Sequence, residues 1–200
     1  MNAAALPAIA TLHEGGYYVG RYRIAGVPYA LIVAPKAEGE HAPIAWNRPP
    51  KMVEGALSYC DGLANTRAMA EAGSKLAEWA LNARIGGFTD WYLGALDENE
   101  LLYRYLKPGM EKNGGWARSG INLSADPPTW PHTPVEPAQT SIALFQDGGS
   151  EAFEKEAYWT STQHASFSVY AWLQYFDNGT QVNWYETDEL RARFVRRLPL

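Results

Sequence analysis

The sequence predicts an α+β fold, because strand-like patterns at the two ends of the chain flank helical patterns in its middle. Three observations support this class. Residues 17–34 carry two apolar runs separated by Ala25-Gly26, residues 53–106 carry apolar residues at helical spacing, and residues 158–197 contain several short strand-like runs. The length of 200 residues fits one domain with a single core.

The N-terminal segment, residues 1–47, is predicted to contain a β-hairpin that serves for attachment and belongs to the same globule. Over residues 17–24, Tyr18 and Tyr22 fall on one side and the arginines at 21 and 23 on the other, as in a half-buried strand. A second strand is expected over residues 27–34, where Pro28 favours the sheet edge or the strand start. Residues 36–50 are expected to be a polar connection, and residues 48–200 the main domain.

Three helices are predicted between residues 53 and 108. The first covers an apolar stripe at positions 53 to 64, which Asp61-Gly62 weakens, and the second covers positions 69 to 80 and ends at the glycine pair 86–87. The third begins at Asp97, with a glutamate three residues later as in a capping box, and stops at Pro108. Cys60 lies on the first stripe, where a small buried hydrophobe is expected rather than a nucleophile.

A long ordered loop and then strands are predicted for the rest of the chain. Residues 109–149 contain five prolines between positions 127 and 137, with a short helix near residues 140–145. Strand patterns follow at residues 158–162, 170–176, 181–185 and 193–197. Asn178-Gly179, between the second and third of these, predicts a tight β-hairpin.

Charge and composition exclude several classes of function. A formal net charge of −5 lacks the basic footprint that phosphate backbones require, so no nucleic-acid partner is expected. One cysteine and four scattered histidines offer no metal-ligand spacing, so we expect no metal and no other cofactor. No apolar run reaches the roughly 18 residues of a membrane span, and the first residues lack the features of a signal peptide. We therefore expect synthesis in a cytoplasm without membrane insertion.

No motif in the chain predicts catalysis, and we expect a protein that is not an enzyme. Nucleotide-binding loops and nucleophile elbows are absent from the sequence. Acidic clusters occur at residues 151–156 and 186–189, and a glycosidase would need two carboxyl groups held about 5 to 10 Å apart. Solvated charge is the simpler interpretation, and a carbohydrate-active enzyme that uses Glu186 or Asp188 stays an alternative.

An aromatic stretch at residues 158–185 is the candidate binding surface. Trp172 and Phe176 share one face of the predicted strand while Tyr175 points to the other, so some of these rings must be exposed. Exposed tyrosines and tryptophans beside small polar residues are typical of antibody paratopes. Rings are expected to stack on sugars or fill partner pockets, while amide and imidazole groups fix orientation. The candidate ligand-binding residues are His164, Phe167, Tyr170, Tyr175, Asn183, Trp184 and Tyr185.

Several motifs in the same order resemble one known family, the domain of unknown function found at the C-terminus of the bacterial collagen-like adhesin Lcl. The resemblance covers about residues 53–198 and is to the form encoded in tailed bacteriophages and prophages. The residues that carry it are Ile85-Gly86-Gly87-Phe88-Thr89-Asp90-Trp91-Tyr92-Leu93, the helix predicted from Asp97 to Leu102, Tyr158-Trp159-Thr160-Ser161-Thr162-Gln163, Ala171-Trp172, Arg193-Phe194-Val195-Arg196-Arg197 and, for the phage form, Asp61-Gly62-Leu63-Ala64-Asn65-Thr66.

The family is similar in fold to C-type lectins and formylglycine-generating enzymes, so the resemblance implies a C-type-lectin-like domain with helices packed on short, twisted antiparallel sheets. It places Trp91, Trp159, Trp172 and Phe176 in the structural framework. The chain departs from the family after Leu93, where Gly94-Ala95-Leu96 replaces the usual proline and polar helix start.

The resemblance does not imply catalysis or calcium binding. Formylglycine-generating enzymes need active-site cysteines, whereas this chain has Cys60 alone, and the calcium-binding triplets of lectins do not occur in it. Phage members of the family are sometimes targets of diversity-generating retroelements, which vary exposed C-terminal residues. The composition of residues 164–185 fits such a target.

These patterns together favour a non-enzymatic, receptor-binding module of a bacteriophage virion. A tail-tip or tail-fibre protein for host attachment is expected, with a bacterial surface glycan or protein as ligand. The alternative is a structural virion protein, for capsid decoration or tail assembly, whose aromatic face binds other virion subunits. In either case we expect a homo-oligomer located in the virion.

Overall fold

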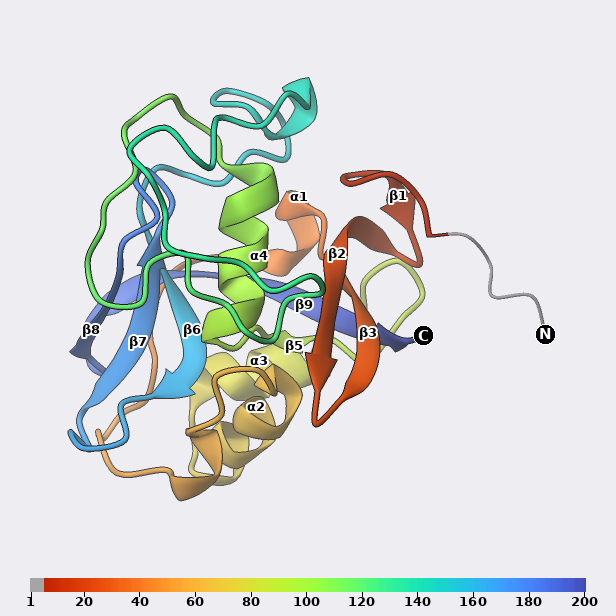
Figure 1. Ribbon diagram of the computed structural model, residues 1–200. Helices are drawn as coiled ribbons and strands as arrows, with labels where there is room; N and C mark the ends of the chain where they lie inside the picture. Colours follow the sequence, from red (N-terminus) through yellow and green to blue (C-terminus); the bar gives the residue numbers. More distant parts are fainter. Residues whose placement is uncertain (1–5) are drawn as a thin grey trace.

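A sheet of nine strands runs through the computed structural model, which describes residues 6–200 (Figure 1). The strand order is β1-β2-β3-β9-β6-β7-β8, and β4 and β5 pair with β9 as well. The strands are β1 (Leu12–His13), β2 (Gly16–Ile24), β3 (Val27–Val33), β4 (Glu40–Ala45), β5 (Tyr92–Leu93), β6 (Ala157–Gln163), β7 (Tyr170–Tyr175), β8 (Gln181–Tyr185) and β9 (Glu189–Pro199). The helices are α1 (Lys36–Gly39), α2 (Gly62–Glu71), α3 (Lys75–Asn82) and α4 (Leu96–Leu106), with 3₁₀ turns η1 (Glu54–Ala56) and η2 (Ala143–Phe145). The α+β class is thereby confirmed.

β9 lies at the centre of the sheet and is longer than the sequence predicts. It pairs antiparallel with β3, β4 and β5 along different parts of its length, and parallel with β6 at Tyr158 and Arg191. Val33 of the N-terminal hairpin lies opposite Val195 of β9. The predicted hairpin is confirmed, and its second strand is an interior strand of the same sheet, with Pro28 near its start.

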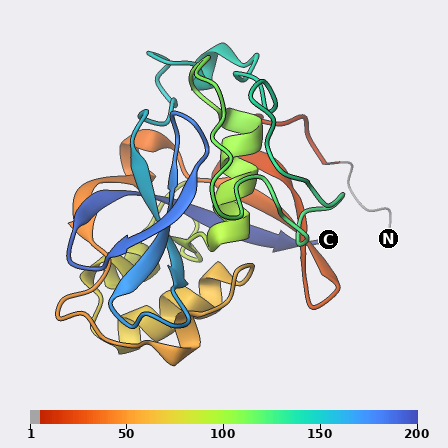
Figure 2. The same ribbon diagram turned by 60° about the vertical axis from the view of Figure 1, so that its left-hand side comes forward.

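Helices cover both faces of the sheet, as Figures 1 and 2 show. Side chains of β3 alternate between two cores: Ile32 packs in a core with α2 and α3, whereas Leu31 and Val33 pack in a core with α4. This two-sided burial explains why β3 is almost continuously apolar.

The four framework residues implied by the family resemblance are buried. Trp91, Trp159 and Phe176 are wholly buried, and Trp172 is 9% exposed. Trp159 donates its indole N–H to the carbonyl oxygen of Ile44 at 2.9 Å, so its polar edge is satisfied as well.

The first helix begins nine residues later than the stripe at positions 53 to 64 predicts. Residues 54–56 form η1, and α2 begins at Gly62, where Asp61 Oδ1 accepts a hydrogen bond from the Ala64 N–H at 3.0 Å. An aspartate that weakens a helix interior is favourable at its N-cap, which explains the shift. The expected position of Cys60 on a helix is therefore wrong: it lies half-buried in the bend before α2.

The apolar stripe at positions 69 to 80 belongs to two helices rather than one. α2 ends at Glu71, Gly73 takes a φ of +93°, and Ser74 Oγ caps α3 by accepting from the Ala77 N–H at 3.4 Å. α3 ends at Asn82, so the expected C-cap role of the glycine pair 86–87 is also wrong. Those glycines form a separate turn between Ile85 and Phe88.

The start of α4 differs from the predicted capping box. Its N-cap is Ala95, whose N–H donates to Glu98 Oε2 at 2.8 Å, so Glu98 supplies the capping carboxylate. Glu100, the predicted partner, is buried and accepts a hydrogen bond from Gln174 at 2.8 Å. The N-cap of α4 therefore lies two residues before Asp97, the predicted start.

Residues 36–50, expected as a connection, contain α1 and β4. The sequence does not predict β4, because its composition is polar and Pro43 interrupts its strand pattern. The pairing of β4 with β9 is irregular there, between His41 and Ile44. Trp46 follows β4, is wholly buried and donates its indole N–H to the Thr160 carbonyl at 2.8 Å.

The predicted long loop at residues 109–149 contains η2 and runs over α4 (Figure 2). Backbone and side-chain hydrogen bonds fix it there: the Thr140 N–H donates to the Lys107 carbonyl at 3.0 Å, and Arg104 donates to the Gly120 carbonyl at 3.0 Å. In the described part of the chain, no helix is both long and apolar enough to span a bilayer.

Candidate ligand-binding surface

The hairpin of β7 and β8 presents two different faces. Tyr170 lies opposite Tyr185 and Trp172 opposite Asn183, so these four side chains share one face. The turn at Asn178-Gly179 that the sequence predicts sets this register.

Five aromatic side chains and one imidazole form a continuous row on this face. Ring centroids are 6.3 Å apart between Tyr59 and Trp172, 5.7 Å between Trp172 and His164, and 4.7 Å between His164 and Phe167. The row continues at 6.0 Å to Tyr170 and then at 4.4 Å to Tyr185. Phe167 and Tyr185 are 58% and 52% exposed. We call this the aromatic row: Tyr59, Trp172, His164, Phe167, Tyr170 and Tyr185.

The structure brings together five of the seven candidate residues and separates two. His164, Phe167, Tyr170 and Tyr185 belong to the aromatic row, and Asn183 lies beside Trp172 on its face. Trp184 lies opposite Ala171 on the other face and is 47% exposed.

Tyr175 also belongs to the other face of the hairpin, where it is half-buried against the core that contains Leu173. A single contact surface made of all seven residues is therefore incompatible with the strand alternation, since neighbouring residues of one strand point to opposite sides.

Tyr59 and Arg118 join the surface from distant parts of the chain, and the sequence analysis missed both. The Arg118 guanidinium lies 4.3 Å from the centroid of the Tyr59 ring. Arg118 Nη2 donates to Asp97 Oδ1 at 2.9 Å and to the Ile121 carbonyl at 3.3 Å. Both residues lie in irregular segments, where periodicity carries no signal about facing direction.

Trp172 leaves one polar group without a partner beneath the row. Its indole N–H is buried and makes no hydrogen bond within residues 6–200. Buried polar groups are nearly always satisfied in native proteins, so such an exception is a feature to explain.

His164 holds the loop between β6 and β7 in place. Its Nδ1 accepts hydrogen bonds from the N–H groups of Ser166 at 3.1 Å and Phe167 at 3.2 Å. Two donors on one ring nitrogen require that Nδ1 carry no proton, so the neutral ring is protonated on Nε2. The imidazole thereby fixes the position of Phe167 in the row.

Replacement of His164 by alanine should loosen this loop, because the N–H groups of Ser166 and Phe167 then lose their acceptor. We expect protection of these two amides against hydrogen exchange to fall in His164→Ala. His164→Asn should keep the protection, since its side-chain oxygen can accept the same N–H groups. Equal protection in the unmodified protein and in both variants would contradict the assigned role.

Glu186 holds the loop between β6 and β7 indirectly, through Gln163. Its Oε1 accepts from Gln163 Nε2 at 2.5 Å, and its Oε2 accepts from the Lys51 N–H at 3.4 Å. Gln163 Nε2 also donates to the Ser168 carbonyl at 3.3 Å. Burial raises the pKa of Glu186 to about 7, since its hydrogen bonds only partly offset the loss of solvent.

The raised pKa of Glu186 predicts a protein that loses stability as the pH rises. Between about pH 4.5 and 7 the folded chain holds a proton on Glu186 that the unfolded chain has released, so the free energy of unfolding falls across this interval. Thermal unfolding should therefore give a higher Tm near pH 5 than near pH 8. Glu186→Gln should reduce this difference, whereas an unchanged difference would show that Glu186 titrates elsewhere.

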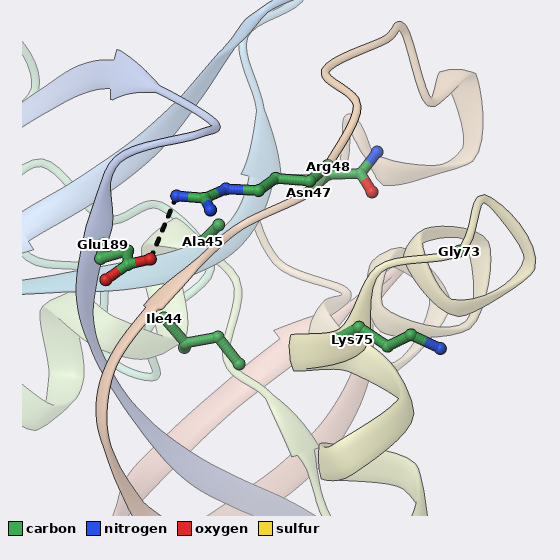
Figure 3. Close-up of a pocket in the computed structure, with 7 residues that line it drawn as sticks. All are labelled: Ile44, Ala45, Asn47, Arg48, Gly73, Lys75 and Glu189. Carbon is green, nitrogen blue, oxygen red and sulfur yellow. Dashed lines mark hydrogen bonds and ion pairs between the residues drawn. The ribbon is translucent and has the colours of Figure 1, made fainter.

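Two hollows of the described chain are lined by residues outside the aromatic row. The first, of about 190 Å³, lies between β4 and the start of α3, and Arg48 crosses it to Glu189 at 3.1 Å (Figure 3). The second, of about 460 Å³, lies beside Lys107 under residues 134–139. Lys107 Nζ already donates to three oxygens, including the carbonyl of Glu111 at 2.6 Å.

Within residues 6–200, no group of three or more His, Cys, Asp or Glu side chains is placed to hold a metal ion. Glu186, the candidate for carboxylate chemistry, is buried beneath the loop rather than open to a substrate. No protein-family model matches the sequence, and the search of curated proteins gives no match either.

Proposed function

We propose that the protein is a non-enzymatic, C-type-lectin-like binding module of a bacteriophage virion, and that the aromatic row contacts its ligand. The ligand is a bacterial surface glycan or protein, and the module belongs to a receptor-binding tail tip or fibre. The observation that supports this proposal best is the row itself, six rings in which each lies beside the next, with Phe167 and Tyr185 more than half exposed. Large rings held rigidly by their neighbours lose little entropy on binding.

The test is binding of fluorescently labelled protein to candidate bacterial cells, with and without excess soluble surface polysaccharide. The double variant Phe167→Ala/Tyr185→Ala should lose at least about 30-fold in affinity, the equivalent of about 2 kcal/mol for central aromatic anchors. The melting temperature should change little, because both side chains are exposed.

Trp184→Ala is the matched control, because it removes an exposed ring from the same strand but from the other face. It should leave cell binding within about twofold of the unmodified protein. Loss of binding in Trp184→Ala but not in the double variant would contradict the assignment of the row.

A role as a structural virion protein is the second candidate. Its support is a set of apolar side chains in the long loop that are each at least 65% exposed: Met110, Trp116, Leu123, Trp130 and Val135. Exposed rings of this kind fit contacts with other virion subunits. Trp116→Ser/Trp130→Ser should then block incorporation into particles while leaving cell binding intact.

Removal of residues 1–47 cannot separate the two functions, because β3 pairs with β9 inside the sheet.

A further inference from the structure

One end of the aromatic row carries a guanidinium. We propose that Arg118 binds a carboxylate of the ligand, and that the ligand is an acidic segment of a protein. This inference rests on the proposed function of the aromatic row. It adds a specificity-determining cation from the long loop to a surface built from β7, β8 and the loop before them.

Arg118 has donors left for a ligand. Its hydrogen bonds within residues 6–200 come from Nη2, which donates to Asp97 and to Ile121, so the two N–H groups of Nη1 have no partner there. The side chain is 30% exposed, and its guanidinium lies over Tyr59 at 4.3 Å. Nη2 belongs to both paired edges of the guanidinium and is already occupied, and Nε is buried without a partner in the described chain, so Nη1 is the nitrogen that can donate to a carboxylate.

The position of Arg118 is fixed before any ligand arrives. Asp97, its partner, is itself held by Ser124 Oγ at 2.7 Å and is 95% buried at its side chain. The turn that carries Arg118 is closed by the Ser119 N–H to the Trp116 carbonyl at 3.1 Å. Because the arginine is already ordered, little side-chain entropy is lost when it binds.

The turn is also attached to the hairpin that carries the row. The Gln181 N–H at the start of β8 donates to Ser119 Oγ at 3.0 Å. This hydrogen bond holds the turn that carries Arg118 against the hairpin that carries Tyr170 and Tyr185, although the long loop and the hairpin are far apart in the sequence.

The packing of the rings favours a protein over a glycan. Sugars stack on open ring faces, but rings of this row pack against one another. The His164 ring is stacked on the Trp172 ring with an interplanar angle of 18°, and it is tilted by 32° from the neighbouring Phe167 ring. Beside the exposed rings of Phe167 and Tyr185 lie the exposed, small polar side chains of Ser166 and Ser168. That combination is typical of surfaces that bind proteins.

The test uses the ¹⁵N-labelled full chain and three small probes. They are the blocked dipeptide acetyl-Phe-Glu-amide, its acetyl-Phe-Gln-amide counterpart, and glucuronic acid. The Glu dipeptide should shift the signals of the Arg118 guanidinium and the Trp172 indole N–H, with a Kd of about 1 to 10 mM. The Gln dipeptide should bind about tenfold more weakly, because it lacks the charge that strengthens the hydrogen bond.

Variants of Arg118 decide whether this residue is responsible. Arg118→Gln should abolish the preference for the Glu dipeptide, whereas Arg84→Gln, an exposed arginine near Ile85 and away from the row, should preserve it. Arg118→Lys, which keeps the charge and the pairing with Asp97 possible, serves where Arg118→Gln unfolds and should reduce the preference several-fold.

Three outcomes would overturn the inference. They are equal binding of the Glu and Gln dipeptides, an intact preference in the Arg118 variants, and the absence of any shift at the concentrations used. Shifts caused by glucuronic acid but not by the dipeptides would assign the carboxylate to a glycan and overturn the peptide ligand.

Cell binding separates this inference from the proposed function. If Phe167→Ala/Tyr185→Ala abolishes cell binding while Arg118→Gln leaves it unchanged, the proposed function stands and the role of Arg118 is wrong. If neither variant changes cell binding, the aromatic row is not the contact surface and the proposed function fails, whatever the dipeptides show.

Discussion

Replacement of Arg193 by methionine should lower the free energy of unfolding by about 3 to 5 kcal/mol, the usual cost of removing one partner from a buried ion pair. Arg193 is wholly buried at its side chain and donates to Glu151 Oε2 at 2.6 Å. It also donates to the carbonyl oxygens of Glu151 at 2.7 Å and Ala34 at 2.9 Å. A methionine fills similar space but removes the donor from two carbonyl oxygens and leaves Glu151 Oε2 with the Lys36 N–H as its donor.

The effect of Arg193→Met should appear as a fall in Tm of roughly 10 °C for a chain of this size. Glu40 adds to the loss: its Oε2 lies 4.0 Å from Arg193 and has no hydrogen-bond partner within residues 6–200. Burial already raises the pKa of Glu40, and removal of the nearby cation should raise it further.

Glu156→Gln is the control for this prediction. Glu156 is 58% exposed, and its partner Arg191, two residues from Arg193 on β9, is 25% exposed. Such a pair contributes about 0 to 1 kcal/mol, so the control should unfold close to the unmodified protein. Equal destabilisation by the two substitutions would show that the contribution of Arg193 is not its buried pairing.

Replacement of Glu98 by leucine should destabilise the fold by at least about 3 kcal/mol, because it leaves several buried donors unsatisfied. Glu98 Oε1 accepts from the hydroxyl groups of Tyr22 at 2.6 Å and Tyr92 at 2.5 Å. Glu98 Oε2 accepts from the N–H groups of Gly62 at 3.0 Å and Ala95 at 2.8 Å. One wholly buried carboxylate thereby joins β2, β5 and the first residues of α2 and α4.

Glu98→Gln should be far less damaging than Glu98→Leu. Its oxygen can accept from the two backbone N–H groups, and its amide can donate to the two tyrosine hydroxyls, which accept as well as donate. Burial raises the pKa of Glu98 to about 7, so the glutamine also stands in for the protonated carboxyl. Urea unfolding at constant pH measures both variants, and similar losses from leucine and glutamine would contradict the role of the accepted hydrogen bonds.

The sequence predicts most elements of the fold where a local signal exists. The hairpins at Ala25-Gly26 and Asn178-Gly179 are confirmed, because tight turns are determined by the two residues that form them. β4 was not predicted, because residues 40–45 form a strand by pairing with β9 and carry no strand pattern of their own. The division between α2 and α3 was missed because an apolar stripe continues across Gly73 while the backbone does not.

In the candidate site, too, the sequence predicts the residues whose own segments carry a pattern and misses those that tertiary packing brings in. Phe167, Tyr170 and Tyr185 were predicted as exposed rings, but the sequence alone placed Trp184 with them, although strand alternation turns it away. Tyr59 and Arg118 reach the row through tertiary packing, and nothing in their own segments indicates it. The α+β class follows from patterns, whereas the membership of the surface requires the fold.

The central position of β9 has a consequence for synthesis of the chain. The Arg193 side chain bonds the Ala34 carbonyl across 159 residues, and β3 has no neighbour on that side until β9 is made. At translation rates of about 5 to 20 residues per second, the N-terminal hairpin waits roughly 10 to 30 s for the strand that completes the sheet. During this interval the nascent chain carries an open, apolar strand edge, so its yield depends on protection from other nascent chains until β9 closes the sheet.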